Sequence, residues 1–74
     1  MDTPLRKMRV ERGLTLADLS VATNIDVGNL SRIERGKQLT SIETAEKISR
    51  FFDGTISEMQ ILYPQRYMAA QAAA

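Results

Sequence analysis

Apolar residues recur three and four positions apart along most of the chain, and few segments show the alternation that is typical of strands. This periodicity predicts an all-α fold of five short helices. Leu14, in the first connection, is expected to join the core. The other residues expected to face inward are, in chain order, Leu5 and Met8, Leu19 and Ala22, Leu30 and Ile33, then Ile42, Ala45, Ile48, Ser49 and Phe52, and finally Ile56, Met59 and Leu62.

Capping residues mark where these helices are expected to begin and end, because a Ser, Thr, Asp or Asn before a helix accepts from a free N–H group of its first turn. The expected N-caps are Thr3, Thr15 and Asp26, then Thr40 in a T-x-x-E capping box or its neighbour Ser41, and Thr55 in a second such box with Glu58. The expected stops are Gly13, Asn24, Gly36 and the pair Asp53-Gly54. The second and third helices, joined by a tight turn, predict a helix-turn-helix.

The third predicted helix, over residues 27–35, has two different faces. Leu30 and Ile33 are three residues apart and face inward. Ile25 precedes Leu30 at the spacing of a hydrophobic staple, which fixes the angle at which the chain enters a helix. The outward positions are small, hydrogen-bonding or cationic, with no second apolar stripe, and they are Val27, Gly28, Asn29, Ser31, Arg32 and Arg35.

The length and composition limit the chain to one small domain and exclude several kinds of site. With 74 residues, we expect a domain over residues 1–63 and an alanine-rich tail over residues 64–74. Pro64 either ends the fold or begins a final turn. The chain has no Cys and no His, which excludes a disulfide, a thiolate zinc site and a histidine base. We therefore expect no metal, no cofactor and no enzymatic activity.

The hydropathy and the charge distribution narrow the possible functions only a little. No apolar run approaches the roughly 20 residues that span a bilayer, and the segment MDTPLRK lacks the core of a signal peptide. We expect a cytoplasmic protein without a membrane partner. Residues 1–13 and 27–42 each carry an excess of two positive charges, and residues 43–62 an excess of two negative charges. A difference this small fits either a DNA-facing side or an ordinary solvated surface.

The segment from Leu5 to Met59 resembles the helix-turn-helix domain of the phage repressor, Cro and XRE type. The resemblance is carried by LSRIERGK (residues 30–37) followed by SIET (residues 41–44), together with Gly13-Leu14-Thr15, Leu19 and Ile25. It implies a compact lambda-repressor-like domain whose third helix enters the major groove of DNA, and dimeric regulation of transcription. It also implies a partly buried ion pair between Arg9 and Glu34. The chain departs from the pattern at Leu16, where the family often has a Gln that binds DNA.

Reading DNA requires groups that match base edges, and cations or N–H groups that bind phosphates. Arg32 is the first choice for a base contact, because its guanidinium fork fits O6 and N7 of guanine; the alternative is a phosphate contact. Asn29 reads adenine or binds phosphate, Val27 touches a thymine methyl group or packs in the first turn, and Gly28 permits close approach to the groove. The expected phosphate contacts are Thr15, Ser31, Arg35, Lys37, Gln38, Thr40 and Ser41.

A single module of this size offers few base contacts, so two copies on half-sites about 34 Å apart would improve discrimination. The candidate dimer surface consists of Phe51, Ile61, Leu62 and Tyr63, with Tyr67 and Met68 as further candidates. The alternative is that Phe51 and Leu62 complete the core of the monomer.

These features favour a sequence-specific transcriptional regulator of the repressor, Cro-like or controller type. The expected partner is an inverted-repeat operator in double-stranded DNA, bound by a homodimer, and no small-molecule ligand is expected. The alternative is a helix-turn-helix adaptor or antitoxin that acts mainly through protein–protein contacts. The cationic outer face of the third helix favours the first interpretation, because an adaptor more often presents apolar anchors there.

Overall fold

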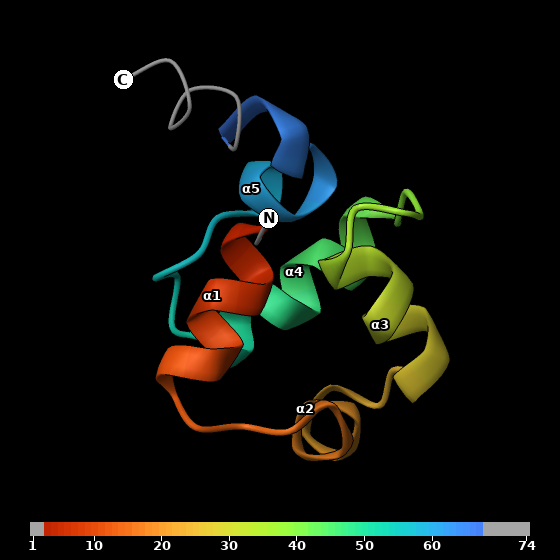
Figure 1. Ribbon diagram of the computed structural model, residues 1–74, viewed down its shortest axis with the longest axis vertical. Coiled ribbons are helices and arrows are strands. Elements are labelled where there is room, and N and C mark those ends of the chain that lie inside the picture. The colour runs from red at the N-terminus through yellow and green to blue at the C-terminus, as the bar shows by residue number, and fades with distance from the viewer. Residues whose placement is uncertain (1–2, 68–74) are drawn as a thin grey trace.

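Five helices make up most of the computed structural model, which describes residues 3–67. They are α1 (Pro4–Glu11), α2 (Leu16–Thr23), α3 (Val27–Glu34), α4 (Ile42–Phe51) and α5 (Glu58–Leu62), as Figure 1 shows. A further helical turn follows over residues 64–67, and none of the described residues forms a strand. The predicted all-α fold is confirmed.

Local capping explains where the helices begin. The predicted caps Thr3, Thr15 and Asp26 each accept a hydrogen bond from a backbone N–H group in the first turn of α1, α2 and α3. α4 begins after Ser41, the second of its two candidate caps, whose hydroxyl accepts from the N–H group of Thr44. The backbone takes positive φ at every predicted stop, namely Gly13, Asn24, Gly36, Asp53 and Gly54. Short-range chemistry therefore sets most of the helix limits.

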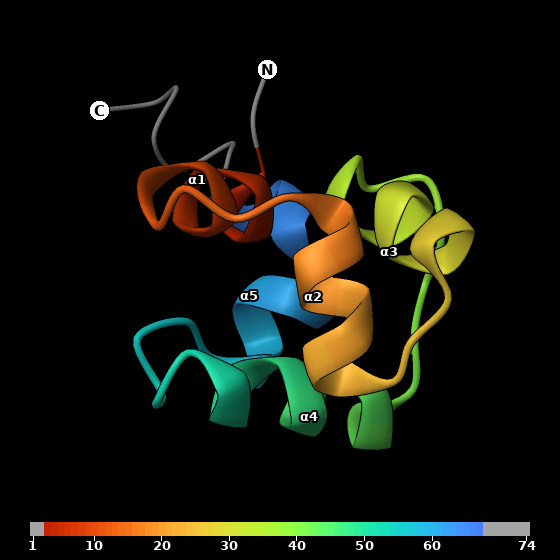
Figure 2. The ribbon, with the colours of Figure 1, turned by 90° about the horizontal axis from the view of Figure 1, so that it is seen from below.

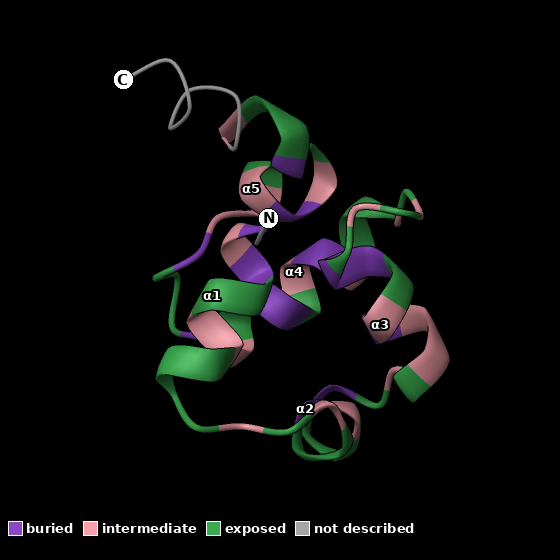
Figure 3. Cartoon of the chain, viewed as in Figure 1, coloured by how far each residue is buried: buried purple, intermediate pink, exposed green. Residues whose placement is uncertain are grey.

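The helices surround one shared core. In Figure 2, α2 crosses in front of α5, with α1 above, α4 below and α3 at one side. α4 contacts α5 and α2, α1 contacts α5 and α3, and α2 contacts α3. Buried residues gather on the sides of the helices that face this centre (Figure 3). The core consists of Leu5, Leu19, Leu30, Ile33, Ala45, Ile48, Phe52, Ile56 and Ile61, with Met8, Leu14, Leu16, Ile25, Phe51 and Leu62 partly buried against it.

Three residues that were expected to face inward are exposed, namely Ala22, Ile42 and, in α5, Met59. Ala22 is exposed, and Thr23 takes the buried position beside it. Thr23 can be buried because its hydroxyl donates to the carbonyl oxygen of Leu19 at 2.7 Å, so no polar atom is left unpaired. Ile42 is 59% exposed, because it is the first residue of α4 and the buried stripe of that helix begins only at Ala45.

The beginning of α5 corrects a third prediction. The hydroxyl of Thr55 donates to the carbonyl oxygen of Phe52 at 2.6 Å and closes the turn after α4, so Thr55 does not cap α5. Ser57 caps it instead, in a capping box with Gln60. The helix therefore turns Ile61, which is 3% exposed, into the core and leaves Met59 41% exposed.

This change removes Ile61 from the predicted dimer surface, because a residue buried in the core of one chain cannot face a second copy. Phe51 and Leu62 are partly buried against the core, so they at least contribute to it, which was the alternative considered for them. The ring of Phe51 meets that of Phe52 edge-on, with centroids 4.9 Å apart. Tyr63, 44% exposed, is the most accessible of the predicted dimer residues.

Packing continues beyond the predicted end of the domain at residue 63. Pro64 is buried and begins the final turn, which settles the choice left open for it. The side-chain Nε2 of Gln65 donates to the carbonyl oxygen of Gly36 at 3.3 Å. Tyr67 is the last described residue, and Met68 with the remainder of the predicted tail lies outside the described residues.

Candidate functional site

The turn between α2 and α3 is held by side-chain contacts at both ends. Asn24 has φ 58° and ψ 37°, the left-handed conformation predicted for it. The hydroxyl of Ser20, in α2, donates to the carbonyl oxygen of Ile25 at 2.6 Å. Ile25 in turn packs against the core that contains Leu30. These contacts fix α3 relative to α2, so the predicted helix-turn-helix is present.

α3 buries one face and presents the other to solvent. Leu30 and Ile33 are 0% and 3% exposed. Gly28 and Arg32 lie on the opposite face, with Asn29 beside it and Val27 in the first turn before Leu30; Val27 and Arg32 are exposed, and Gly28 and Asn29 are half-buried. In both Figure 1 and Figure 2, α3 lies at an edge of the molecule beside the connection to α4. The structure thus brings these four residues together on an accessible helix.

An ion pair ties α3 to α1. The Nε and Nη2 atoms of Arg9 donate to the two carboxylate oxygens of Glu34, each at 2.8 Å. The third nitrogen, Nη1, donates to the carbonyl oxygen of Leu14, just before α2, at 2.7 Å. The hydroxyl of Thr3 also donates to the carbonyl oxygen of Glu34. One guanidinium therefore ties α3 and the connection before α2 to α1, and its hydrogen bonds to Glu34 raise the pKa of Arg9.

Arg32 is held by two amide side chains on the exposed face. Its Nη2 donates to Oδ1 of Asn29 at 2.6 Å, and its Nε donates to Oε1 of Gln38 at 2.7 Å. Gly28 lies beside this guanidinium. A Cβ atom at Gly28 would stand 2.9 Å from Oδ2 of Asp26 and 3.5 Å from Nη1 of Arg32. A side chain at residue 28 would therefore displace the capping carboxylate of Asp26, and its Cβ would be in van der Waals contact with Arg32.

The residues predicted to bind phosphate lie at two places. Most of them lie along the end of α3 and the connection to α4, and these are Ser31, Arg35, Lys37, Gln38, Thr40 and Ser41. Thr15 lies at the beginning of α2, where its hydroxyl accepts from the N–H group of Asp18 at 3.0 Å. The N–H group of Thr15 donates back to the Asp18 carboxylate, which lowers the pKa of Asp18.

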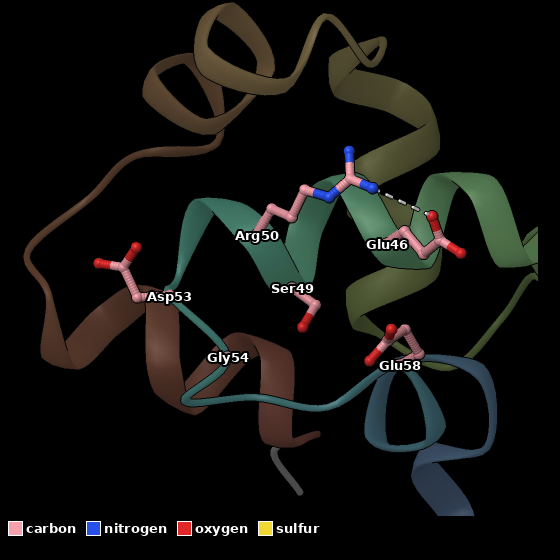
Figure 4. A pocket seen from close by; sticks show the side chains of 6 residues that line it. All are labelled: Glu46, Ser49, Arg50, Asp53, Gly54 and Glu58. Atoms are coloured by element: carbon pink, nitrogen blue, oxygen red, sulfur yellow. Dashed lines mark ion pairs between the residues drawn. The ribbon is translucent and has the colours of Figure 1, made fainter.

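Negative charge gathers away from α3. A hollow of about 550 Å³ lies between the end of α4 and the beginning of α5, and Figure 4 shows its lining side chains. It carries the carboxylates of Glu46, Asp53 and Glu58 and a single cation, Arg50, which pairs with Glu46 at 3.5 Å. Ser49 also lines it, but its hydroxyl donates to the carbonyl oxygen of Ile56. A polyanion is repelled from this side, whereas Arg32, Arg35 and Lys37 lie together on and just beyond α3.

Sequence reasoning missed Leu39, which is 77% exposed in the connection between α3 and α4. It borders a hollow of about 140 Å³ together with Leu62 and Pro64. The periodic pattern could not find Leu39, because the residue lies in a loop; the only signal was a large apolar residue within the polar stretch KQLTS.

Residues 3–67 contain neither a metal-binding cluster nor a membrane-spanning helix. No group of three or more Asp, Glu, His or Cys side chains in that range is arranged to hold a metal ion. None of the helices described is both long and apolar enough to cross a bilayer.

Comparisons with known proteins agree with the presence of a helix-turn-helix. A family model described as helix-turn-helix matches residues 5–59. The HTH-type transcriptional regulator DdrOP3 of Deinococcus deserti is 38% identical over 55 residues, which are 74% of this chain and 43% of that protein. The chain therefore matches less than half the length of this curated relative. No solved structure matches the chain.

Proposed function

The chain belongs to the helix-turn-helix family that its motifs predicted, and on this premise we propose that it regulates transcription by binding double-stranded DNA in a sequence-specific manner. The observation that carries the proposal is the outer face of α3. That face is accessible, bears Asn29 and Arg32, and is backed by a buried apolar face and a nearly buried ion pair. A helix with such a rigid support can be placed against base edges with little loss of conformational freedom.

In the proposed complex, α3 lies in the major groove with Val27, Gly28 and Arg32 toward the bases. Arg32 donates to O6 and N7 of guanine, and Val27 contacts a thymine methyl group. Gly28 has no side chain, so the backbone of the first turn approaches the groove closely.

Phosphate contacts on either side of α3 fix its register in the groove. Arg35 and Lys37 supply charge on one side. The first turns of α2 and α4, capped by Thr15 and Ser41, offer the N–H groups that their caps leave unpaired. Ser31, Gln38 and Thr40 complete the expected set.

A homodimer on an inverted repeat doubles these contacts. We propose that the two copies meet through the exposed apolar side chains near the end of α5. This surface keeps Leu62 and Tyr63 from the sequence prediction, omits Ile61 and Phe51, and adds Met59 and Leu39. Leu39 is 77% exposed and Tyr63 44% exposed, and exposed apolar residues of this size that lie close together are typical of interfaces.

Selection of binding sites from a random duplex library tests the proposal. We expect an inverted repeat with half-sites about one helical turn apart. Arg32→Ala should weaken binding by about 1–3 kcal/mol and relax one position in each half-site. Arg50→Ala is the matched control, because Arg50 is an exposed arginine on the acidic side of the molecule and its loss should change neither affinity nor preference.

Salt dependence separates phosphate contacts from base contacts. Lys37→Ala should weaken binding to all sequences equally and lower the slope of log K against log salt by about 1 per half-site. Lys47→Ala, on the side of α4 that faces α2, should leave the slope unchanged. A library that enriches no sequence, with weak binding that Arg32→Ala does not alter, would refute the proposed function and favour a protein partner.

A further inference from the structure

The guanidinium of Arg32 donates two hydrogen bonds to side chains of the same protein. Two amide oxygens hold it, Oδ1 of Asn29 at 2.6 Å and Oε1 of Gln38 at 2.7 Å. Asn29 lies one turn before Arg32 on α3, but Gln38 belongs to the connection to α4. The orientation of the exposed arginine is therefore set partly from outside its own helix.

The donors that remain are sufficient for a base. A guanidinium has five N–H donors, and a bidentate contact with guanine needs two. The two amide oxygens engage one N–H on Nε and one on Nη2, which leaves three, including both on Nη1. Nη1 lies on the side of Gly28, where a Cβ atom would come within 3.5 Å of it. The absence of a side chain at residue 28 thus keeps the unengaged end of Arg32 open.

We propose that Gln38 is a positioning residue for base recognition, which together with Asn29 presents Arg32 in a preformed orientation that accepts guanine. This inference rests on the proposed function. It gives Gln38 a role different from the direct phosphate contact expected from the sequence. It also gives Asn29 a supporting role, because its carbonyl oxygen accepts from Nη2 of Arg32.

The arrangement favours guanine for two reasons. Guanine offers two acceptors, O6 and N7, whereas adenine presents a donor next to N7, which would face the N–H groups of Arg32. An arginine held at Nε and Nη2 also cannot swing freely to a phosphate, so it discriminates between bases more than a mobile one would. Ordering a long side chain before binding is worth roughly 2- to 10-fold in affinity.

The first test measures the ordering of Arg32 without DNA, by NMR relaxation of its side-chain Nε–H. We expect Nε to be as ordered as the backbone in the natural sequence. Gln38→Met keeps the length of the side chain, removes the acceptor and should make Nε mobile. Gln38→Glu keeps an acceptor and should retain the order. A mobile Nε in the natural sequence, or no change in Gln38→Met, would overturn the inference whether or not DNA binds.

The second test measures base discrimination on the selected operator. Replacing guanines one at a time with 7-deazaguanine removes the N7 acceptor and identifies the guanine that Arg32 contacts. Gln38→Met should weaken binding to the natural operator roughly 2- to 10-fold per half-site, leave binding to the substituted operator unchanged, and have no effect when combined with Arg32→Met. Gln65→Met is the matched control, because Gln65 bonds the carbonyl oxygen of Gly36 and not Arg32.

The outcomes distinguish this inference from the proposed function. If the natural sequence prefers guanine and Gln38→Met weakens all sequences equally, Gln38 is a phosphate contact, and the inference fails while the proposed function stands. If Gln38→Met still weakens binding when it is combined with Arg32→Met, the inference again fails while the proposed function stands. If the library enriches no sequence, both fail.

Discussion

Glu34→Ala tests how the fold holds α3 in place. The Glu34 side chain is 3% exposed and that of Arg9 12% exposed, and two hydrogen bonds of 2.8 Å join them. Removing the carboxylate leaves a nearly buried guanidinium whose Nη1 still donates to the carbonyl oxygen of Leu14. Breaking one partner of a buried pair costs about 3–5 kcal/mol, because the other charge stays buried without compensation.

This loss is large for a domain of 74 residues, whose whole free energy of unfolding is about 4–11 kcal/mol at 0.05–0.15 kcal/mol per residue. Glu34→Ala should therefore lower Tm by at least about 12 °C, since 1 kcal/mol shifts Tm by about 4–8 °C at this size. Because the hydrogen bonds that Arg9 donates to Glu34 raise the already high pKa of Arg9, alkaline pH should not break the pair.

The assay is urea unfolding followed by circular dichroism, applied to a double-mutant cycle of Arg9→Met, Glu34→Met and the combined variant. The combined variant should lose less than the sum of the single losses, because both charges are removed together. Glu46→Ala is the control, since its pair with Arg50 is 44% and 79% exposed, and the loss should stay below about 1 kcal/mol. If a single variant is unfolded in water, Glu34→Gln supplies a milder loss that can be measured. Additive losses, or a loss in Glu34→Gln no larger than in Glu46→Ala, would refute the reasoning.

Three further predictions concern the caps and the core. Asp26→Ala should destabilise the domain by about 0.5–2 kcal/mol in urea unfolding through loss of the α3 cap, whereas Asp26→Asn should keep most of it. The N–H group of Thr15 lowers the pKa of Asp18, so the contribution of this carboxylate to stability is complete above its unfolded pKa and is lost as pH falls through its lower folded pKa. Stability should therefore drop below about pH 4, and Asp18→Asn should reduce that drop. Ile61→Ala should cost about 2–5 kcal/mol, whereas Tyr63→Ala should leave the monomer's stability nearly unchanged and weaken dimerisation in sedimentation equilibrium.

The fold was predictable where short-range chemistry decided it. Asn24 lies in the predicted left-handed turn, and Asp26 caps α3 as predicted. Ile25 and Leu30 have the predicted staple spacing, and both pack into the core. Each of these features depends on residues within five positions of one another, so the local sequence contained the information.

α5 shows why the same rules failed elsewhere. Both Thr55-x-x-Glu58 and Ser57-x-x-Gln60 satisfy the capping-box pattern, and the sequence does not choose between them. The choice depends on the turn after α4, where the Thr55 hydroxyl is already bonded to the carbonyl oxygen of Phe52. With Ser57 as the cap, Ile56 and Ile61 take the staple positions, and both are buried. A single misplaced cap therefore moved Ile61 from the core to a predicted dimer surface.

The candidate site was predictable as a set of residues but not as an arrangement. The face that carries Asn29 and Arg32 follows from helical periodicity alone. Gln38 is the second partner of Arg32 and lies six residues after it, in a loop without periodicity. Its contact with Arg32 depends on the path of that loop. If Gln38 positions Arg32, base preference belongs to α3 and the following connection together. We therefore expect that moving the outer residues of α3 alone into another helix-turn-helix domain would transfer the charge of the site without its full preference for guanine.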